Sequence, residues 1–170
     1  MFSAIAIKLV TVLLGYVMET HILNNESYIE IDGAPSWYMK NEDSDKYYSF
    51  YVMNGNIAEI EKAKDLLHSK MEKNLRNDLD IALHKSFEEF SEDERAMAMN
   101  LTKLDNLDYF VKTYTVMPYI KHTKKDVIYV GGYIPKSEIE HYLLKKIEKT
   151  KVKISDKKSD EMMMELRQRQ

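Results

Sequence analysis

Residues 56–90 read NIAEIEKAKDLLHSKMEKNLRNDLDIALHKSFEEF, and this stretch decides the fold class. Apolar residues recur along it in steps of three or four, which places them on one side of a long amphipathic helix. Asn56, followed three positions later by Glu59, predicts a capped start for this helix. The apolar stripe consists of Ile60, Ala63, Leu67, Met71, Leu75, Leu79, Ala82 or Leu83, Phe87 and Phe90.

Further elements are predicted on both sides of this helix. Ser91 with Glu94 forms a second capping pair, and it predicts a helix over residues 92–104. Runs that are rich in aromatic and β-branched residues, or that alternate apolar and polar residues, predict strands. The predicted strands are 28–31, 47–53, 109–120 and 127–134, and a closing helix is predicted from Ser137.

The order of the predicted elements is β-β-α-α-β-β-α, which indicates an α+β fold. Strands that are adjacent in sequence usually pair, so we expect an antiparallel or mixed sheet of about four strands with the helices on one face. Pro118 lacks a backbone donor and predicts an edge strand or a bulge. Gly131 and Gly132 within a strand predict a bulge or a close backbone approach.

The two ends of the chain differ from this central domain, residues 19–150. Residues 1–18 read MFSAIAIKLVTVLLGYVM and carry one charge, Lys8. This pattern is typical of a secretory signal, a membrane anchor or a buried element of the fold. Residues 151–170 are first Lys-rich and then Met-rich, which predicts a disordered tail or a short helix that binds a partner.

Charge is distributed unevenly along the chain. Residues 19–100 contain 18 acidic and 9 basic residues, whereas residues 121–158 contain 11 lysines and 5 acids. This asymmetry can mark a surface that binds nucleic acid or a membrane, it can orient copies of one protein head to tail, or the two regions can simply be solvated faces. The chain has no cysteine, which excludes disulfides, thiolate metal sites and lipidated cysteine.

The sequence contains no recognisable catalytic motif, so we expect a protein that is not an enzyme and has no cofactor. His68 with Glu72, and His84 with Glu88, have helical i,i+4 spacing, but two-residue pairs of this kind arise by chance, and we expect no metal site. Aromatic strands beside basic loops can bind nucleic acids. Because the element order differs from that of RNA-recognition domains, we expect these aromatic residues to pack across strands.

Two stretches resemble a known family of envelope proteins. The first runs from Pro35-Ser36-Trp37 through Asn54-Gly55-Asn56 into the helix containing Ala58 and Ala63, and the second is residues 127–140, VIYVGGYIPKSEIE. Together they resemble the bacterial outer-membrane lipoprotein family of about twenty kilodaltons, whose relatives include the flagellar basal-disc protein FlgP and the secreted protein Tip-alpha. The resemblance covers residues 28–149. It implies a non-enzymatic protein of the periplasm or membrane that self-associates or docks into an envelope or flagellar assembly.

The sequence therefore leaves three functional hypotheses. The first is an envelope-associated, homo-oligomeric assembly protein that contacts the membrane through residues 1–18. The second is a cytoplasmic interaction module, with nucleic-acid binding as one of its forms, and the third is an enzyme or small-ligand binder. For an interaction protein, the expected core or interface aromatics are Trp37, Tyr51 and Tyr133, and the expected electrostatic contact loop carries Lys121, Lys124 and Lys125.

Overall fold

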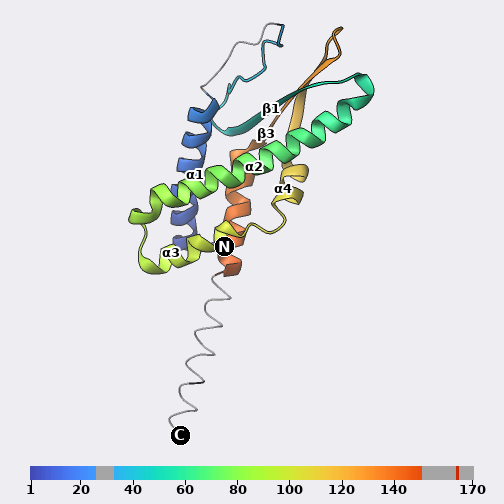
Figure 1. Cartoon of the computed structure of the whole chain (residues 1–170). Helices are drawn as coiled ribbons and strands as arrows, with labels where there is room; N and C mark the ends of the chain where they lie inside the picture. The colour runs from blue at the N-terminus through green and yellow to red at the C-terminus, as the bar shows by residue number, and fades with distance from the viewer. Residues whose placement is uncertain (26–32, 151–163, 165–170) are drawn as a thin grey trace.

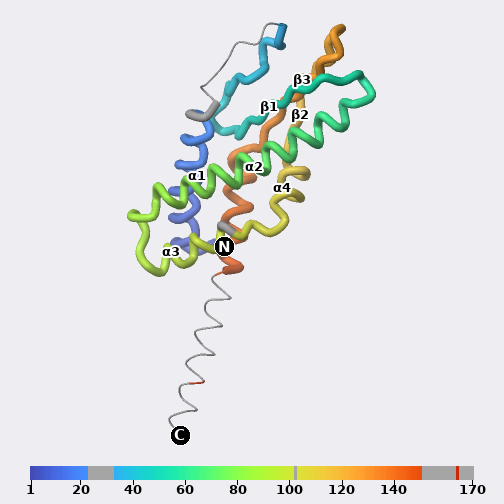
Figure 2. The backbone as a smooth tube through the Cα atoms, in the orientation of Figure 1, coloured from blue at the N-terminus to red at the C-terminus, as the bar shows by residue number. Residues whose placement is uncertain are grey.

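The computed structural model describes residues 1–25, 33–150 and Met164, and Figures 1 and 2 show how its elements are arranged. This part of the chain is an α+β fold with a three-stranded antiparallel sheet. Short 3-10 turns η1 (Ile57–Glu59), η2 (Phe87–Glu89) and η3 (Asn100–Thr102) join several of the longer elements. The longer elements are α1 (Ala4–Asn25), β1 (Lys46–Asn54), α2 (Ile60–Ser86), α3 (Glu92–Met99), α4 (Leu107–Tyr114), β2 (Val116–His122), β3 (Val127–Pro135) and a last helix over residues 136–150.

The sheet has β3 in the centre, with β1 on one side and β2 on the other. Side chains along a strand alternate between its two faces. On β1, Tyr47 and Tyr51 therefore point toward α2, while Tyr48 and Phe50 point to the opposite face. Residues 33–40 cover that opposite face, so the sheet lies between helices on one side and a short irregular segment on the other.

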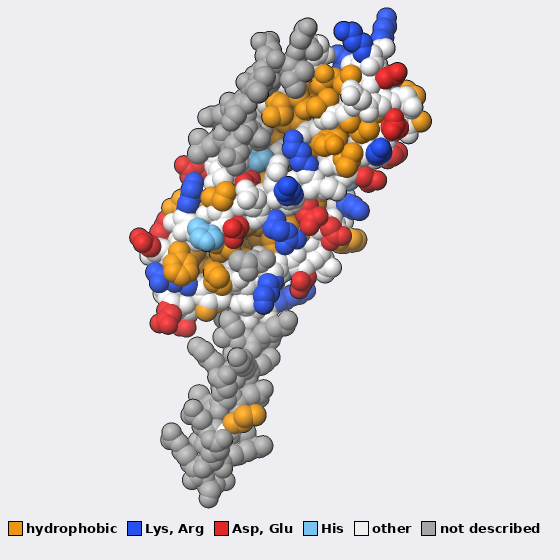
Figure 3. All heavy atoms as spheres, viewed as in Figure 1, with side chains coloured by type: hydrophobic (Ala, Val, Ile, Leu, Met, Phe, Trp, Pro, Cys, Tyr) orange, Lys and Arg blue, Asp and Glu red, His pale blue; other side chains and the backbone are white. Residues whose placement is uncertain are grey.

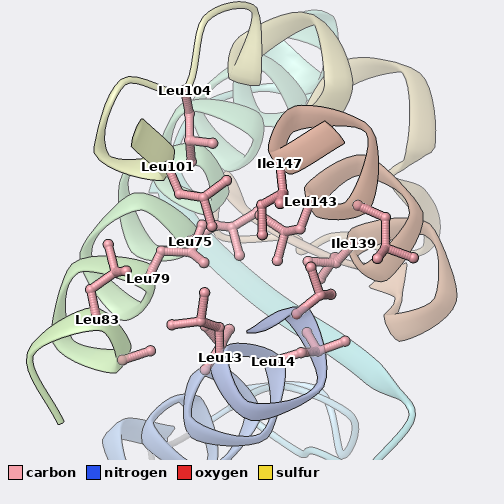
Figure 4. Packing of buried hydrophobic residues seen from close by; sticks show 14 of the residues in the cluster. Leu13, Leu14, Leu75, Leu79, Leu83, Leu101, Leu104, Ile139, Leu143 and Ile147 are labelled. Atoms are coloured by element: carbon pink, nitrogen blue, oxygen red, sulfur yellow. The ribbon is translucent and has the colours of Figure 1, made fainter. Parts of the chain in front are cut away.

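Helix α2 is shared by both halves of the core. Near its start, Ala63 and Leu67 pack on Ile128 and Val130 of β3. The second half of α2 packs instead against α1 and the last helix, both of which cross it in Figures 1 and 2. Figure 4 shows how the apolar side chains of these elements meet; the labelled residues are Leu13, Leu14, Leu75, Leu79, Leu83, Leu101, Leu104, Ile139, Leu143 and Ile147.

Both capping boxes expected around α2 and α3 are confirmed. The Asn56 side chain accepts a hydrogen bond from the Ala58 amide at 2.9 Å, and Glu59 accepts one from the Asn56 amide at 3.1 Å. Ser91 and Glu94 make the same reciprocal pair at the start of α3. These bonds satisfy amides that a helix start leaves unpaired, so they fix where each helix begins.

The apolar N-terminal stretch forms a core helix. Leu9, Leu13 and Val17 are fully buried, whereas Ile5 and Ile7 on the outer side are 44% and 47% exposed. The helix continues through residue 18, the expected boundary of the N-terminal segment, as far as Asn25. By length and composition alone, residues Ala4–Ile22 could cross a bilayer, but half of that stretch is buried inside the fold, so this is weak evidence for a span.

Helix α4 corrects the strand predicted over residues 109–120. Only Val116–His122 is extended, and Leu107–Tyr114 is helical. The reason lies in the spacing, because Leu107, Phe110 and Val111 follow the helical steps of three and four and are all buried. The aromatic and β-branched composition favoured a strand, but burial of this helical face outweighs that preference.

The four-strand sheet and its order are also corrected. The described residues contribute three strands in the order β1-β3-β2, and all pairings are antiparallel. The strand predicted over residues 28–31 lies outside the described residues. The last helix begins at residue 136, directly after β3, so Ser137 lies within its first turn and is not its cap.

The predictions from Pro118 and the two glycines are confirmed. β2 is an edge strand, and its pairing with β3 is irregular between Val116 and Tyr119, on either side of Pro118. A Cβ atom on Gly132 would lie 2.8 Å from the carbonyl oxygen of Val116. Glycine is therefore required where the irregular part of β2 crosses β3.

We predict that Gly132→Ala lowers the free energy of unfolding by about 1–3 kcal/mol, because a backbone carbonyl must move to admit the methyl group. Gly15→Ala is the matched control. Gly15 lies on the exposed side of α1 with no atom within 4 Å of the added Cβ, so the same change should raise the free energy of unfolding by about 0.5–1 kcal/mol. Urea unfolding followed by circular dichroism measures both values, and equal effects at the two positions would contradict this packing.

Candidate functional site

A buried polar cluster connects α1, α2 and β1. The His21 Nδ1 atom lies 3.2 Å from Oδ2 of Asp78, and its Nε2 lies 2.6 Å from the carbonyl oxygen of Tyr48. The Tyr47 hydroxyl donates to the same Asp78 oxygen at 2.6 Å, and the His21 ring stacks on the Tyr47 ring with centroids 3.7 Å apart. Because a carbonyl only accepts, Nε2 of His21 carries the proton in this contact.

The geometry of this cluster is that of a structural network. His21 and Asp78 are 3% and 2% exposed, so neither side chain is open to a substrate. Burial raises the pKa of the Tyr47 phenol well above its ordinary value, and the neighbouring Asp78 charge raises it further. Tyr47 therefore stays protonated and keeps its donor role. The cluster joins three elements that lie far apart in the sequence.

His21 of this cluster and Lys70 of α2 together cover one edge of β1. The Tyr48 and Phe50 carbonyls are two residues apart on β1 and so point to the same edge of the strand. His21 donates to the first, and the ammonium group of Lys70 on α2 donates to the second at 2.6 Å. Burial lowers the pKa of Lys70. These two contacts occupy carbonyls that would otherwise be available to pair with another strand.

Sequence reasoning did not single out this cluster, although a signal was present. Asp78 lies three residues after Leu75 and four before Ala82, so a carboxylate interrupts the apolar stripe of α2. A charged residue on a buried helical face requires a partner. That partner, His21, could not be identified from spacing, because it is 57 residues away in the chain.

The predicted interface aromatics do not form one site. Trp37 and Tyr133 lie on the outer face of the sheet, where Trp37 stacks on Tyr119 with ring centroids 5.3 Å apart. Tyr133 lies edge-on to Tyr48 and beneath the ammonium group of Lys46. Tyr51 points to the opposite face and packs toward α2. The structure therefore brings Trp37 and Tyr133 to one face and separates Tyr51 from them.

The three lysines of the predicted contact loop are exposed. Lys121 lies near the end of β2, and Lys124 and Lys125 lie in the turn between β2 and β3. This turn is the tip of the hairpin at the upper right of Figure 1, far from α3. Among the described residues, no three His, Asp or Glu side chains are grouped closely enough to hold a metal ion.

A groove between α2 and the α3–η3 segment is the candidate interaction site, and we call it the α2–α3 groove. It consists of two adjoining hollows that share Asp80 and Leu83. Phe87 and Met99 stand at one end, 44% and 52% exposed. Figure 3 shows hydrophobic side chains reaching the surface in this part of the molecule among charged ones. The floor consists of the buried leucines Leu79, Leu83, Leu101 and Leu104.

The two ends of the groove carry opposite charges. Lys73 and Arg76 lie at the end near Leu104, and Asp80 and Glu88 lie toward the Phe87 end. Arg76 also donates to Glu72 at 3.2 Å and to the Leu104 carbonyl at 3.5 Å, which holds it over the groove's edge. The arrangement suits a short apolar segment with charges of opposite sign at its two ends.

Phe87 was expected in the buried stripe, and that expectation is wrong. The α-helix ends at Ser86, and the 3-10 turn η2 that follows has a different period. Phe87 itself keeps helical backbone angles, φ −56° and ψ −39°, so it lies about 100° around the helix axis from the buried Ser86, at the margin of the stripe, whereas Phe90 is buried. An aromatic residue at the margin of the apolar stripe was the available signal for the groove.

Another hollow lies beside the last helix. Tyr109, Tyr142 and Lys149 are among the residues around it. Lys146 donates to the Asp105 carbonyl at 2.6 Å, which ties the last helix to the loop after α3. Burial raises the pKa of Tyr142 to about 12, so its hydroxyl is protonated at neutral pH. Tyr109 is 70% exposed and borders this hollow, away from the α2–α3 groove.

Comparisons of the chain with models of protein families, with curated proteins and with solved structures gave no match. The candidate site therefore depends on the geometry of the chain itself.

We predict that Asp78→Ala lowers the free energy of unfolding by at least about 2 kcal/mol, since it removes the acceptor of the Tyr47 hydroxyl in a buried site. Asp80→Ala is the matched control, because the Asp80 side chain is 61% exposed on the same helix. Its effect should stay within about 0.5 kcal/mol. Chemical denaturation of both variants tests this, and a similar loss in the two would show that the buried cluster does not hold α1 and β1 to α2.

Proposed function

We propose that the protein is a non-enzymatic interaction protein that self-associates, and that the α2–α3 groove is its contact surface. The observation that carries this proposal is the exposure of Phe87 and Met99 at the end of a floor of leucines. A grouped apolar surface with a charged rim is typical of a protein–protein contact. Chain-wide charge asymmetry supports contact between copies, because opposite patches orient their approach.

A catalytic function has less support from the geometry. The most chemically suggestive pair, His21 and Asp78, is closed to solvent, and its polar atoms are bonded to each other and to β1. A general base must reach a substrate proton, which this enclosure prevents. The α2–α3 groove presents His84 and acidic groups, but the His84 ring nitrogen Nδ1 faces a carbonyl of its own helix at 2.8 Å.

The packing of α1 supports an interaction module in which the N-terminal helix stays in the core. Leu9, Leu13 and Val17 lie against the second half of α2, and removing α1 would uncover that apolar surface. An envelope protein that uses this helix as an anchor would have to expose the same residues to lipid. We therefore favour the cytoplasmic interaction module over the envelope protein that the resemblance implies.

We predict that the full chain forms a dimer in the micromolar range, and that Phe87→Glu combined with Met99→Glu raises the dissociation constant at least about tenfold, or about 1.4 kcal/mol. Two charges on the groove's rim would need desolvation on contact, which weakens association. Sedimentation equilibrium measures the constant.

Ile57→Glu is the matched control for this experiment. Ile57 is 68% exposed, lies in η1 at the other end of α2, and does not line the groove. Its dissociation constant should match that of the unchanged chain. A chain that remains monomeric at every concentration, or a control as weak as the groove variant, would overturn the proposal.

A further inference from the structure

We propose that the α2–α3 groove of one copy binds residues 159–167 of a second copy. This inference rests on the proposed self-association and names the segment that fills the groove. Exchange of two identical tails between two grooves gives a closed, symmetric dimer.

The position where the described domain ends supports this assignment. Lys146 of the last helix donates to the carbonyl of Asp105, the residue that follows Leu104 of the groove floor. The domain therefore ends, at Thr150, close to the end of the groove that carries Lys73 and Arg76. Residues 151–158 form an eight-residue connection that can reach at most about 28 Å. This reach allows the next residues to enter the groove of an adjacent copy.

The sequence of the tail matches the chemistry of the groove. Residues 159–167 read SDEMMMELR, in which methionines and a leucine stand between acids and an arginine. Methionine is unbranched and adapts to irregular apolar surfaces, such as a floor of leucines. Met164 is 65% exposed in the single chain, so this apolar side chain is not buried by its own domain.

The charges match as well. Arg167 lies seven positions after Asp160, and Asp80 likewise lies seven positions after Lys73 on α2. If the tail binds as a helix parallel to α2, equal numbers of residues span equal lengths. Asp160 then lies near Lys73 at one end of the groove, and Arg167 lies near Asp80 at the other.

The absence of cysteine from the sequence allows a direct test by site-specific cross-linking in full-length chains. Met99→Cys in one chain is mixed with Gln170→Cys in a second chain that carries a larger tag at its N-terminus, and the mixture is oxidised mildly. In the proposed register residue 170 lies opposite Leu83, which lines the same hollow as Met99. A disulfide between the two chains gives a heterodimer of unique size on a non-reducing gel. We expect this heterodimer to form at least tenfold faster than with the control chain Tyr109→Cys.

Tyr109 is a demanding control, because it is more exposed than Met99 and borders the hollow that contains Lys149, close to the start of the tail. Equal rates for Met99→Cys and Tyr109→Cys would overturn the proposal. The double variant Met99→Cys/Gln170→Cys distinguishes exchange between copies from binding within one chain. A disulfide within one chain, seen as a monomer of altered mobility, would mean that each groove takes its own tail, and the exchange between copies would be wrong.

A charge exchange tests the proposed register independently. Asp160→Lys should weaken self-association at least tenfold, and Lys73→Glu added to it should restore most of the loss. If the chain self-associates, but neither the disulfide between chains nor the rescue by Lys73→Glu is observed, the binding of the tail in the groove is wrong. The proposed self-association is then still supported. If the unchanged chain is monomeric at every concentration, both the self-association and the binding of the tail are wrong.

Discussion

The apolar stripe of α2 is the feature on which the rest of the structure depends, because two different layers pack on it. Its first turns cover β3 through Ala63 and Leu67, and its later turns hold α1 and the last helix through Leu75 and Leu79. A small sheet is stabilised when its apolar face packs against a helix, and the first turns of α2 cover that face here. By extending past the sheet, α2 allows helices from both ends of the chain to join one core.

Burial alone does not specify how α1 lies on α2, and the polar cluster adds that information. Apolar packing is non-directional, whereas the contacts of His21 with Asp78 and with the Tyr48 carbonyl have defined geometry. Asp78 also receives the Tyr47 hydroxyl, so α1, α2 and β1 meet at one carboxylate. The stripe stabilises the assembly of helices, and the cluster fixes their register.

Local patterns in the sequence were sufficient for much of this fold. The α2 stripe, the Asn56 and Ser91 caps, the edge position of Pro118 and the close approach at Gly132 all depend on residues within a few positions of one another. The features that sequence reasoning missed have other causes. In α4, burial of Leu107, Phe110 and Val111 overrides a composition that favours strands. The His21–Asp78 contact joins residues remote in sequence, and the exposure of Phe87 follows from its place at the margin of the buried stripe.

The proposed function depends on the same arrangement. The leucines that close the core beneath α2 also form the floor of the α2–α3 groove, so the contact surface is an extension of the core. The proposed interaction module requires α1 to remain in this core. The central claim is therefore that α1 and α2 form one cooperative unit.

Hydrogen exchange of the full-length chain tests this claim most directly. The amide hydrogens of residues 9–21 should exchange as slowly as those of residues 71–83, at a rate set by global unfolding. Rapid exchange in residues 9–21 while residues 71–83 remain protected would contradict the account, because α1 would then open independently of the core.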